Sequence, residues 1–257
     1  MISSRAITAA FIAIVALVLL LPGLAGFYTD WLWFEEVDLQ PVFTRILASR
    51  ALLGAAVFLL VFAVLFVNLR LARSALTERT FTVFGPQGPR TISMDLRRLR
   101  PLFVLGAIIA SALMALYASG KWEVWLMARN AVPFGIADPI LGRDIGFYVF
   151  QLPLLNILHT LAMMTLVLSA LIVAGAHFAG QGLMLDPNRG LLVSSAARRH
   201  LSVLAAAMLL LLAFKAWLGV PELLTTASGT VHGASYVDVH ARMPTQWVLV
   251  AVAVIGA

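Results

Sequence analysis

The sequence predicts an all-α protein built as a multi-pass transmembrane bundle, with short interfacial helices in its outer loops. Its residues are 61% hydrophobic and 12% charged, whereas globular domains are roughly 45–50% apolar and about 25% charged. Most apolar residues lie in runs near the ~20 residues that cross ~30 Å of hydrocarbon. Lys and Arg residues are concentrated in alternate loops between these runs, as expected of a chain that crosses a membrane repeatedly.

Five apolar runs are long enough to be membrane spans, and a sixth ends with the sequence. They cover approximately residues 6–24, 51–69, 102–118, 154–179 and 201–219, and the sixth begins at residue 247. The sixth run is too short to cross, so we expect residues 1–257 to be the N-terminal transmembrane domain of a longer protein. The first run resembles a cleaved signal peptide in its charged Arg5 and its GLAG segment, but its length and the spans that follow favour an uncleaved span.

The loop charges predict that the N-terminus lies inside. Arg5, the second loop and the fourth loop together hold eleven basic and three acidic residues. The opposite side holds seven basic and nine acidic residues. Because Lys and Arg are retained on the cytoplasmic side, we expect the first, third and fifth loops to face outside.

The inner loops have simple local patterns. Residues 80–94, TFTVFGPQGPRTISM, alternate around a Gly/Pro turn, which predicts a small β-hairpin. Residues 95–101, DLRRLRP, predict a basic turn that meets anionic head groups.

The outer loops are rich in aromatic residues. Residues 27–37, FYTDWLWFEEV, predict a segment that lies along the membrane surface, because aromatic rings favour the head-group layer. Residues 121–130, KWEVWLMARN, have Trp and Arg at helical spacing and predict a short amphipathic interfacial helix.

Polar residues near the outer ends of two spans are candidates for function. Lys215 lies inside the fifth run, so its ammonium group either extends to the interface or has a buried functional partner. Asn156 and His159 lie near the outer end of the fourth run. They either line a polar crevice with Lys215 or, as we favour, form hydrogen bonds between helices.

A group of His and Asp residues follows the fifth run. His232, Asp238 and His240 have the side chains of a zinc site, but the spacing is not HExxH and no fourth ligand is evident. The chain has no cysteine, which excludes disulfides and thiolate chemistry. We therefore predict no metal, cofactor or catalytic residue. The net charge of +6 lies in particular loops, which fits a membrane protein better than a nucleic-acid-binding one.

The segment DPILGRDIGFYVFQLP, residues 138–153, carries the densest charge in the outer loops. Asp138 precedes a proline and starts a turn, and glycines bracket Arg143 and Asp144. We expect a structured loop in which Arg143 pairs with Asp138 or Asp144, followed by aromatic residues that lead into the fourth span.

Four segments together resemble one family. YTDWLWFEEV, DPILGRDIGFYVFQLPLL, ARRHLSVL…KAWL and GASYVDVHARMP occur in an order and at intervals similar to the N-terminal part of uncharacterised protein family 0182. These are large bacterial membrane proteins, sometimes labelled putative transporters. The resemblance implies about seven N-terminal spans followed by a large extracytoplasmic domain, and it assigns no catalytic residues.

Two functions are consistent with these patterns. We expect a bundle in the bacterial cytoplasmic membrane that anchors the large extracytoplasmic domain and acts as its platform, with that domain and the lipid bilayer as its partners. The alternative is a transport or lipid-handling module in which Lys215, His159 and Asn156 line a path. We expect no enzymatic activity, because no pairing of a nucleophile with a base is visible.

Overall fold

A computed structural model describes residues 4–257 except 77, 86–87, 187–189 and 229–230. The chain divides into two compact units, residues 1–51 and 52–257, which we describe separately. Helices dominate both, and the described strands form only two-stranded sheets. The predicted all-α class is confirmed.

The first unit contains helix α1, Ser4–Glu36, and the start of helix α2, Gln40–Ala72. Residues 27–36, predicted as a separate surface segment, are instead the last turns of α1, so the expected loop is only a short turn. Asp38 makes that turn with φ of 56°, a left-handed conformation that Asp tolerates better than most residues. Phe43 of α2 then packs against Phe27, Trp31 and Phe34, with ring centroids 5.2–5.6 Å apart.

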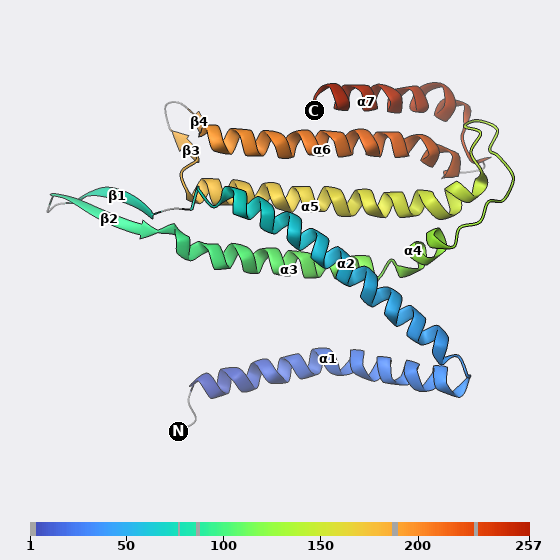
Figure 1. Cartoon of the computed structure of the whole chain (residues 1–257), viewed down its shortest axis with the longest axis horizontal. Coiled ribbons are helices and arrows are strands. Elements are labelled where there is room, and N and C mark those ends of the chain that lie inside the picture. The colour runs from blue at the N-terminus through green and yellow to red at the C-terminus, as the bar shows by residue number, and fades with distance from the viewer. Residues whose placement is uncertain (1–3, 77, 86–87, 187–189, 229–230) are drawn as a thin grey trace. The chain divides into compact units, whose positions relative to one another are not determined.

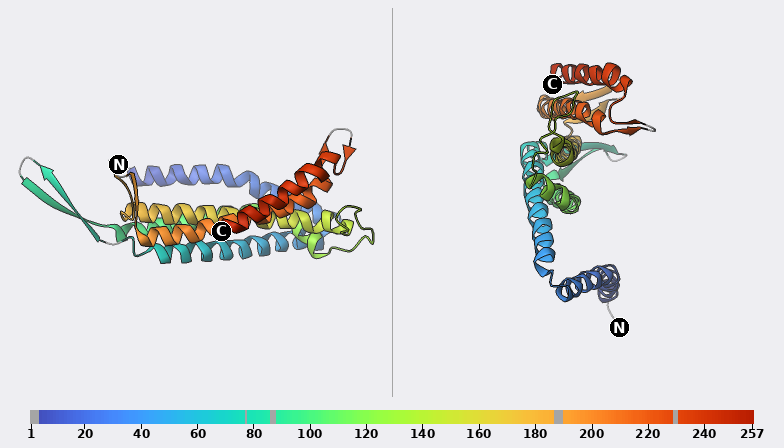
Figure 2. Two further views of the ribbon diagram at one scale, coloured as in Figure 1. Left: turned by 90° about the horizontal axis from the view of Figure 1, so that it is seen from above. Right: turned by 90° about the vertical axis from the view of Figure 1, so that its right-hand side faces the viewer.

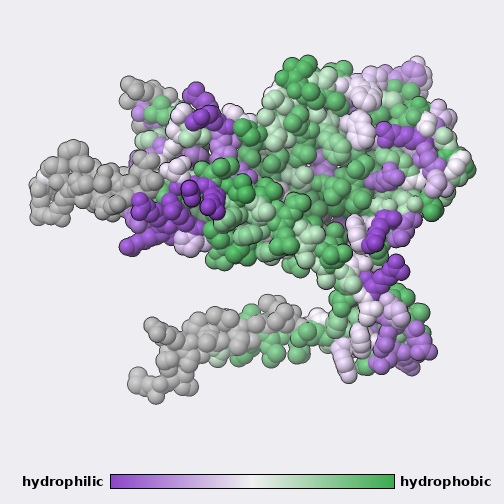
Figure 3. Space-filling view, viewed as in Figure 1, coloured by the Kyte–Doolittle hydropathy of each residue, from purple (hydrophilic) through white to green (hydrophobic). Residues whose placement is uncertain are grey.

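The second unit is a bundle of long helices that reverse direction from one to the next (Figure 1). It holds the rest of α2, and then α3, Arg100–Ser119; α5, Leu152–Ala179; α6, Ser195–Glu222; and α7, Met243–Ile255. Within the described residues, four helical stretches are long and apolar enough to cross a membrane: Gln40–Ala72, Leu96–Ser119, Phe147–Ala179 and Ser195–Thr225. Figure 3 shows an apolar surface over the middle of this unit and hydrophilic residues at both ends.

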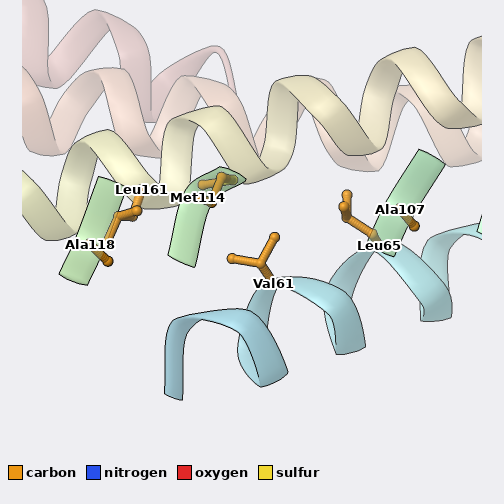
Figure 4. Close-up of a cluster of buried hydrophobic side chains, with 6 residues drawn as sticks. All are labelled: Val61, Leu65, Ala107, Met114, Ala118 and Leu161. Atoms are coloured by element: carbon orange, nitrogen blue, oxygen red, sulfur yellow. The ribbon is translucent and has the colours of Figure 1, made fainter. Parts of the chain in front are cut away.

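One apolar cluster joins three of these helices (Figure 4). Its buried members are Val61 and Leu65 of α2, Ala107, Met114 and Ala118 of α3, and Leu161 of α5. The members on each helix are four, seven or eleven residues apart, so they share one helix face.

The two ends of the second unit differ in structure. We call one the hairpin end, because it carries the pair β1, Glu78–Gly85, and β2, Gly88–Asp95, and the pair β3, Leu183–Asp186, and β4, Gly190–Val193 (Figure 1). The first hairpin confirms the prediction for residues 80–94, whereas the second was not predicted. Residues 96–99 form the 3₁₀ turn of the basic segment, capped by the Asp95 carboxylate, which accepts the Arg97 N–H.

The other end, which we call the loop end, carries helix α4, Trp122–Arg129, and residues 130–151 (Figure 2). The helix predicted at 121–130 is therefore confirmed. A third strand pair, β5, Ala227–Ser228, and β6, Val231–His232, precedes α7. It was not predicted.

Two π-helical turns at the loop end lead into helices. Phe147–Gln151 precedes α5 and Asp238–Arg242 precedes α7, and a proline follows each within two residues. In each turn the N–H just before the proline donates to the carbonyl five residues back. A proline ring crowds the carbonyl four residues back, and the wider turn relieves that contact. Helix α7 consequently starts at Met243, four residues before the predicted start at residue 247.

Candidate functional site

The loop between α4 and α5 folds back on itself at the loop end. Its backbone pairs Ala137 with Asp144, and the Ile145 N–H donates to the Ile136 carbonyl at 2.9 Å. The Asp138 N–H donates to the Arg143 carbonyl at 2.8 Å. The predicted structured loop is therefore present, and it has the form of a small closed ring of residues 137–144.

Asp138 holds that ring together from inside. Its Oδ1 accepts the N–H groups of Ile140 at 2.9 Å and Leu141 at 2.6 Å. Its Oδ2 accepts the Arg143 N–H at 2.9 Å and the Tyr148 hydroxyl at 2.7 Å. Burial alone would raise the pKa of Asp138, but these four hydrogen bonds outweigh it and hold that pKa below its usual value. The carboxylate is therefore ionised and satisfied by the loop itself.

Asp144 clamps the loop to the segment that precedes it. Its carboxylate accepts the N–H groups of Phe134 at 3.1 Å, Gly135 at 2.8 Å and Gly146 at 2.7 Å. The bond from Phe134 is the largest influence on its pKa, which lies below the usual value. A Cβ on Gly146 would lie 2.8 Å from the Asp144 carboxylate and 2.9 Å from the Val132 carbonyl oxygen. The clamp therefore requires glycine at this position.

Arg143 does not pair with either carboxylate, so the ion pair predicted within this loop is wrong. Its guanidinium group lies over the ring of Phe147, 4.5 Å from the centroid, and 5.3 Å from that of Trp217 on α6. The reason is that backbone N–H groups already occupy the oxygens of Asp138 and Asp144. Cation–π contacts of this kind contribute about 0.5–2 kcal/mol, and this one ties the loop to α6.

Lys215 forms the principal polar contact between α5 and α6. Its ammonium donates to Asn156 Oδ1 at 2.8 Å and to Glu222 Oε1 at 2.6 Å. The side chains of Lys215 and Glu222 are 43% and 32% exposed. Lys215 thus has partners, and Asn156 is one of them, as the crevice hypothesis requires.

His159 does not join Lys215 and Asn156 in a polar crevice. Its Nε2 lies 3.1 Å from the Leu211 carbonyl oxygen on α6, which can only accept a hydrogen bond. Together with the Lys215–Asn156 bond, this contact fits the predicted role of interhelical hydrogen bonding. Glu222 was missed, although it lies seven residues after Lys215, which puts the two on one helix face.

Asp238 caps the turn that leads into α7. Its carboxylate accepts the N–H and hydroxyl of Ser235 at 2.8 and 2.7 Å, and the Ser235 hydroxyl accepts the Asp238 N–H at 3.3 Å. This is a capping box. The Ser235 hydroxyl is the largest of the influences that hold the pKa of Asp238 below its usual value. Arg242 adds an ion pair at 2.9 Å, so the carboxylate is fully used by its own segment.

The geometry around Asp238 and His240 does not support a zinc site. His240 stacks on Tyr236, with centroids 4.0 Å apart, and its Nδ1 lies 3.0 Å from the Tyr236 carbonyl oxygen. The side chain of His232 lies outside the described part of the structure. Among the described side chains, no three His, Cys, Asp or Glu residues converge as metal ligands do.

A further polar cluster at the hairpin end was not predicted. His200 Nε2 lies 3.0 Å from Asn68 Oδ1, and Asn68 Nδ2 donates to the Val64 carbonyl at 2.9 Å. The His177 ring lies 6.3 Å from that of His200, edge to face. His177 is 4% exposed, so its side chain is buried between helices.

These features define the class of protein: a multi-pass α-helical membrane protein with one basic end and one end of clamped loops. The chain belongs to the uncharacterised protein family UPF0182, whose family model matches residues 7–257. It is 35% identical to a UPF0182 protein of Geobacter sulfurreducens over 247 residues, which are 93% of this chain and 28% of the relative. It is 36% identical to a UPF0182 protein of Mycobacterium tuberculosis, over 99% of this chain and 26% of the relative. The chain thus spans about a quarter of the length of these curated relatives, and no solved structure matches it.

Proposed function

We propose that this chain is a membrane platform that anchors a large extracytoplasmic domain, in the cytoplasmic membrane of a bacterium and with its N-terminus inside. The relatives are about four times longer than the region they share with this chain, and a full-length protein of their size would lie mostly outside the bundle. Four helical stretches long and apolar enough to cross a bilayer support the anchoring role. The lipid bilayer and that extracytoplasmic domain are the proposed partners.

The observation that carries the proposal is the clamped loop of residues 131–151. Asp138 and Asp144 together accept seven hydrogen bonds, six of them from backbone N–H groups. Arg143 then joins this loop to Trp217 of α6. A loop that is held in one conformation and fixed to a helix offers a rigid surface on which a domain can be attached, whereas a flexible loop does not.

The charge distribution supports the proposed orientation. Nine of the described arginines lie in or next to elements of the hairpin end: Arg70, Arg73, Arg79, Arg90, Arg97, Arg98, Arg100, Arg198 and Arg199. Cytoplasmic loops retain such residues. Because the chain has no cysteine, single cysteines test the orientation in a cysteine-free full-length protein. An impermeant maleimide should label Asn130→Cys in intact cells and Ser74→Cys only after lysis. The reverse pattern would exclude the orientation.

Limited proteolysis of the full-length protein tests the platform role. Arg143→Ala removes the contact with Trp217 and should speed release of the extracytoplasmic domain by added protease. Arg129→Ala is the matched control, because Arg129 also lies over a tryptophan, Trp125, at 5.4 Å, but within the single helix α4. Equal cleavage rates for Arg143→Ala and wild type would refute the proposal that this loop holds the extracytoplasmic domain.

A transport or lipid-handling module is the second candidate, and the Lys215–Asn156–Glu222 contact favours it. Ionisable residues within a membrane-spanning stretch commonly mark a substrate or ion path. On this alternative, Lys215→Ala and His159→Ala abolish complementation of a strain that lacks the full-length protein, while insertion and folding stay normal. Normal complementation by both variants would eliminate it. An enzymatic role is no part of either proposal.

A further inference from the structure

A small cavity at the hairpin end combines cationic and apolar walls. It has a volume of about 240 Å³ and lies between the end of α2 and the start of α3. Its lining residues are Phe66, Leu69, Arg70, Arg73, Leu76, Arg100 and Val104. Three of the seven are arginines and the other four are apolar, so the cavity is built for an amphiphile rather than for a purely polar or purely apolar ligand.

The two kinds of wall are layered along the helices. Arg70 directly follows the apolar run of α2, and Arg100 begins α3 just before its apolar run. Phe66 lies four residues before Arg70 and Val104 four residues after Arg100, so each lies about one turn, or ~5.4 Å, deeper in the apolar part. With the apolar runs of α2 and α3 in the bilayer, the arginines lie at the level of the head groups, and Phe66 and Val104 at the level of the first acyl carbons.

The arginines differ in how far the protein itself uses them. Arg100 Nη2 donates to the carbonyls of Leu76 at 2.9 Å and Arg73 at 3.3 Å, which closes the end of α2. Its Nε is buried and has no acceptor within the described residues. Arg70 and Arg73 are exposed and pair with no described acid. The cavity therefore holds positive charge that no described carboxylate neutralises.

The helix dipoles favour the position of Arg70 but not that of Arg100. Arg70 in the last turn of α2 is favoured by the negative end of that helix. Arg100 is the first residue of α3, where the positive end disfavours a cation and favours an anion. An anion between the two helices would satisfy Arg100 and the start of α3 together, and guanidinium groups match the oxygens of a phosphate.

We propose that this cavity binds the phosphate head group of an anionic phospholipid, with the start of an acyl chain against Phe66, Leu69 and Val104. The apolar wall, and its position at the end of two apolar helical stretches, select a lipid over a soluble phosphate. The inference goes beyond the platform proposal and does not depend on it, because either a platform or a transport module meets the same head groups.

Native mass spectrometry of the full-length protein tests the site. The protein is taken from nanodiscs of equal phosphatidylglycerol and phosphatidylethanolamine, and the lipid that it retains is identified. The test variant is the double change Arg70→Gln, Arg73→Gln, which spares the structural Arg100. Two cationic contacts at about a fivefold preference each predict that the preference for phosphatidylglycerol falls about 25-fold. The control, Arg198→Gln with Arg199→Gln, removes equal charge from exposed positions at the same end and should retain the preference.

Several results would overturn the proposal. Wild type without a preference for phosphatidylglycerol, or an equal loss in test and control variants, would show that the cavity is no site. Displacement of the lipid by glycerol phosphate at the lipid's own concentration would show that the ligand is a soluble phosphate. If the double variant fails to fold, the single changes Arg70→Gln and Arg73→Gln replace it. Each should lose about fivefold, and no loss in either would refute the site.

Discussion

Replacing Asp138 by Asn removes a charge and one acceptor from the centre of the loop at residues 137–144. Each carboxylate oxygen accepts two hydrogen bonds, Oδ1 from the Ile140 and Leu141 N–H groups and Oδ2 from the Arg143 N–H and the Tyr148 hydroxyl. An asparagine puts an NH₂ group in place of one oxygen, whichever way the amide turns. An NH₂ group facing the Ile140 and Leu141 N–H groups loses two hydrogen bonds. If it instead faces Arg143 and Tyr148, only the Arg143 N–H loses its acceptor, because the Tyr148 hydroxyl can turn and accept. One or two hydrogen bonds are therefore lost.

The size of the effect follows from the one or two bonds lost. A typical hydrogen bond contributes about 0.5–1.5 kcal/mol net, so the closed loop should lose about 0.5–3 kcal/mol. At about 1.4 kcal/mol per factor of ten, the open form becomes roughly 2- to 150-fold more populated. Hydrogen exchange of the full-length protein in nanodiscs measures this, because the amides of Ile140, Leu141 and Arg143 are protected only while the loop is closed.

The control for this experiment is Asp30→Asn, which makes the same chemical change in α1. The Asp30 carboxylate has no hydrogen-bond or ion-pair partner among the described residues, so exchange in residues 137–144 should match wild type. Unchanged exchange of the three amides in Asp138→Asn would refute the view that this carboxylate holds the loop closed.

Three other changes test the fold and its electrostatics. The pKa of Asp138 is lowered in the folded loop, so the ionised carboxylate stabilises the closed loop fully above its unfolded pKa of about 3.9, and this stabilisation is lost as pH falls through the lower folded value. The protection of the loop amides from exchange should therefore be constant from about pH 5 to 8 and fall below about pH 4. An increase in their protection on acidification would contradict the lowered pKa. Gly180→Ala should lower the thermal unfolding midpoint by several degrees, because a Cβ there would overlap the backbone of Ala75. The control is Gly106→Ala, where a Cβ would have no neighbour within 4 Å and the midpoint should stay unchanged or rise. Equal midpoints for the two variants would rule out the close approach of Gly180 to Ala75. Ser235→Ala removes the hydroxyl of the capping box and should cost about 1 kcal/mol locally. The result should be faster exchange of the Asp238 amide, in the turn that leads into α7, and an unchanged rate there would count against the cap.

Local patterns predicted the regular elements well. The helix at 121–130 and the hairpin at 80–94 were found because their periods of about 3.6 and 2 residues are properties of neighbouring residues. The start of α7 was misplaced because the apolar run begins at residue 247, whereas a polar π-turn and Pro244 already belong to the helical path. Residues 27–36 were separated from the first span because their polarity changes, although the helix continues through them.

The contacts of the candidate site residues were only partly predicted. Charges close in sequence suggested that Arg143 pairs with Asp138 or Asp144. The sequence alone does not show that backbone N–H groups fill those oxygens and leave the guanidinium group to two aromatic rings. The contact between Lys215 and Asn156 was among the hypotheses. The second partner of Lys215, Glu222, was not predicted, because the two side chains meet only by extending toward each other along α6.

The sequence by itself determined the membrane class, the approximate positions of the long helices and the loops that carry the basic residues. These follow from hydropathy and charge along the chain, which depend on no distant contact. Only the tertiary structure decided which polar groups meet: Lys215 with Asn156, 59 residues apart, and His200 with Asn68, 132 residues apart. It also decided that arginines from α2 and α3 line one cavity. Such contacts depend on the rotation of each helix about its axis and on its neighbours, and hydropathy does not encode either.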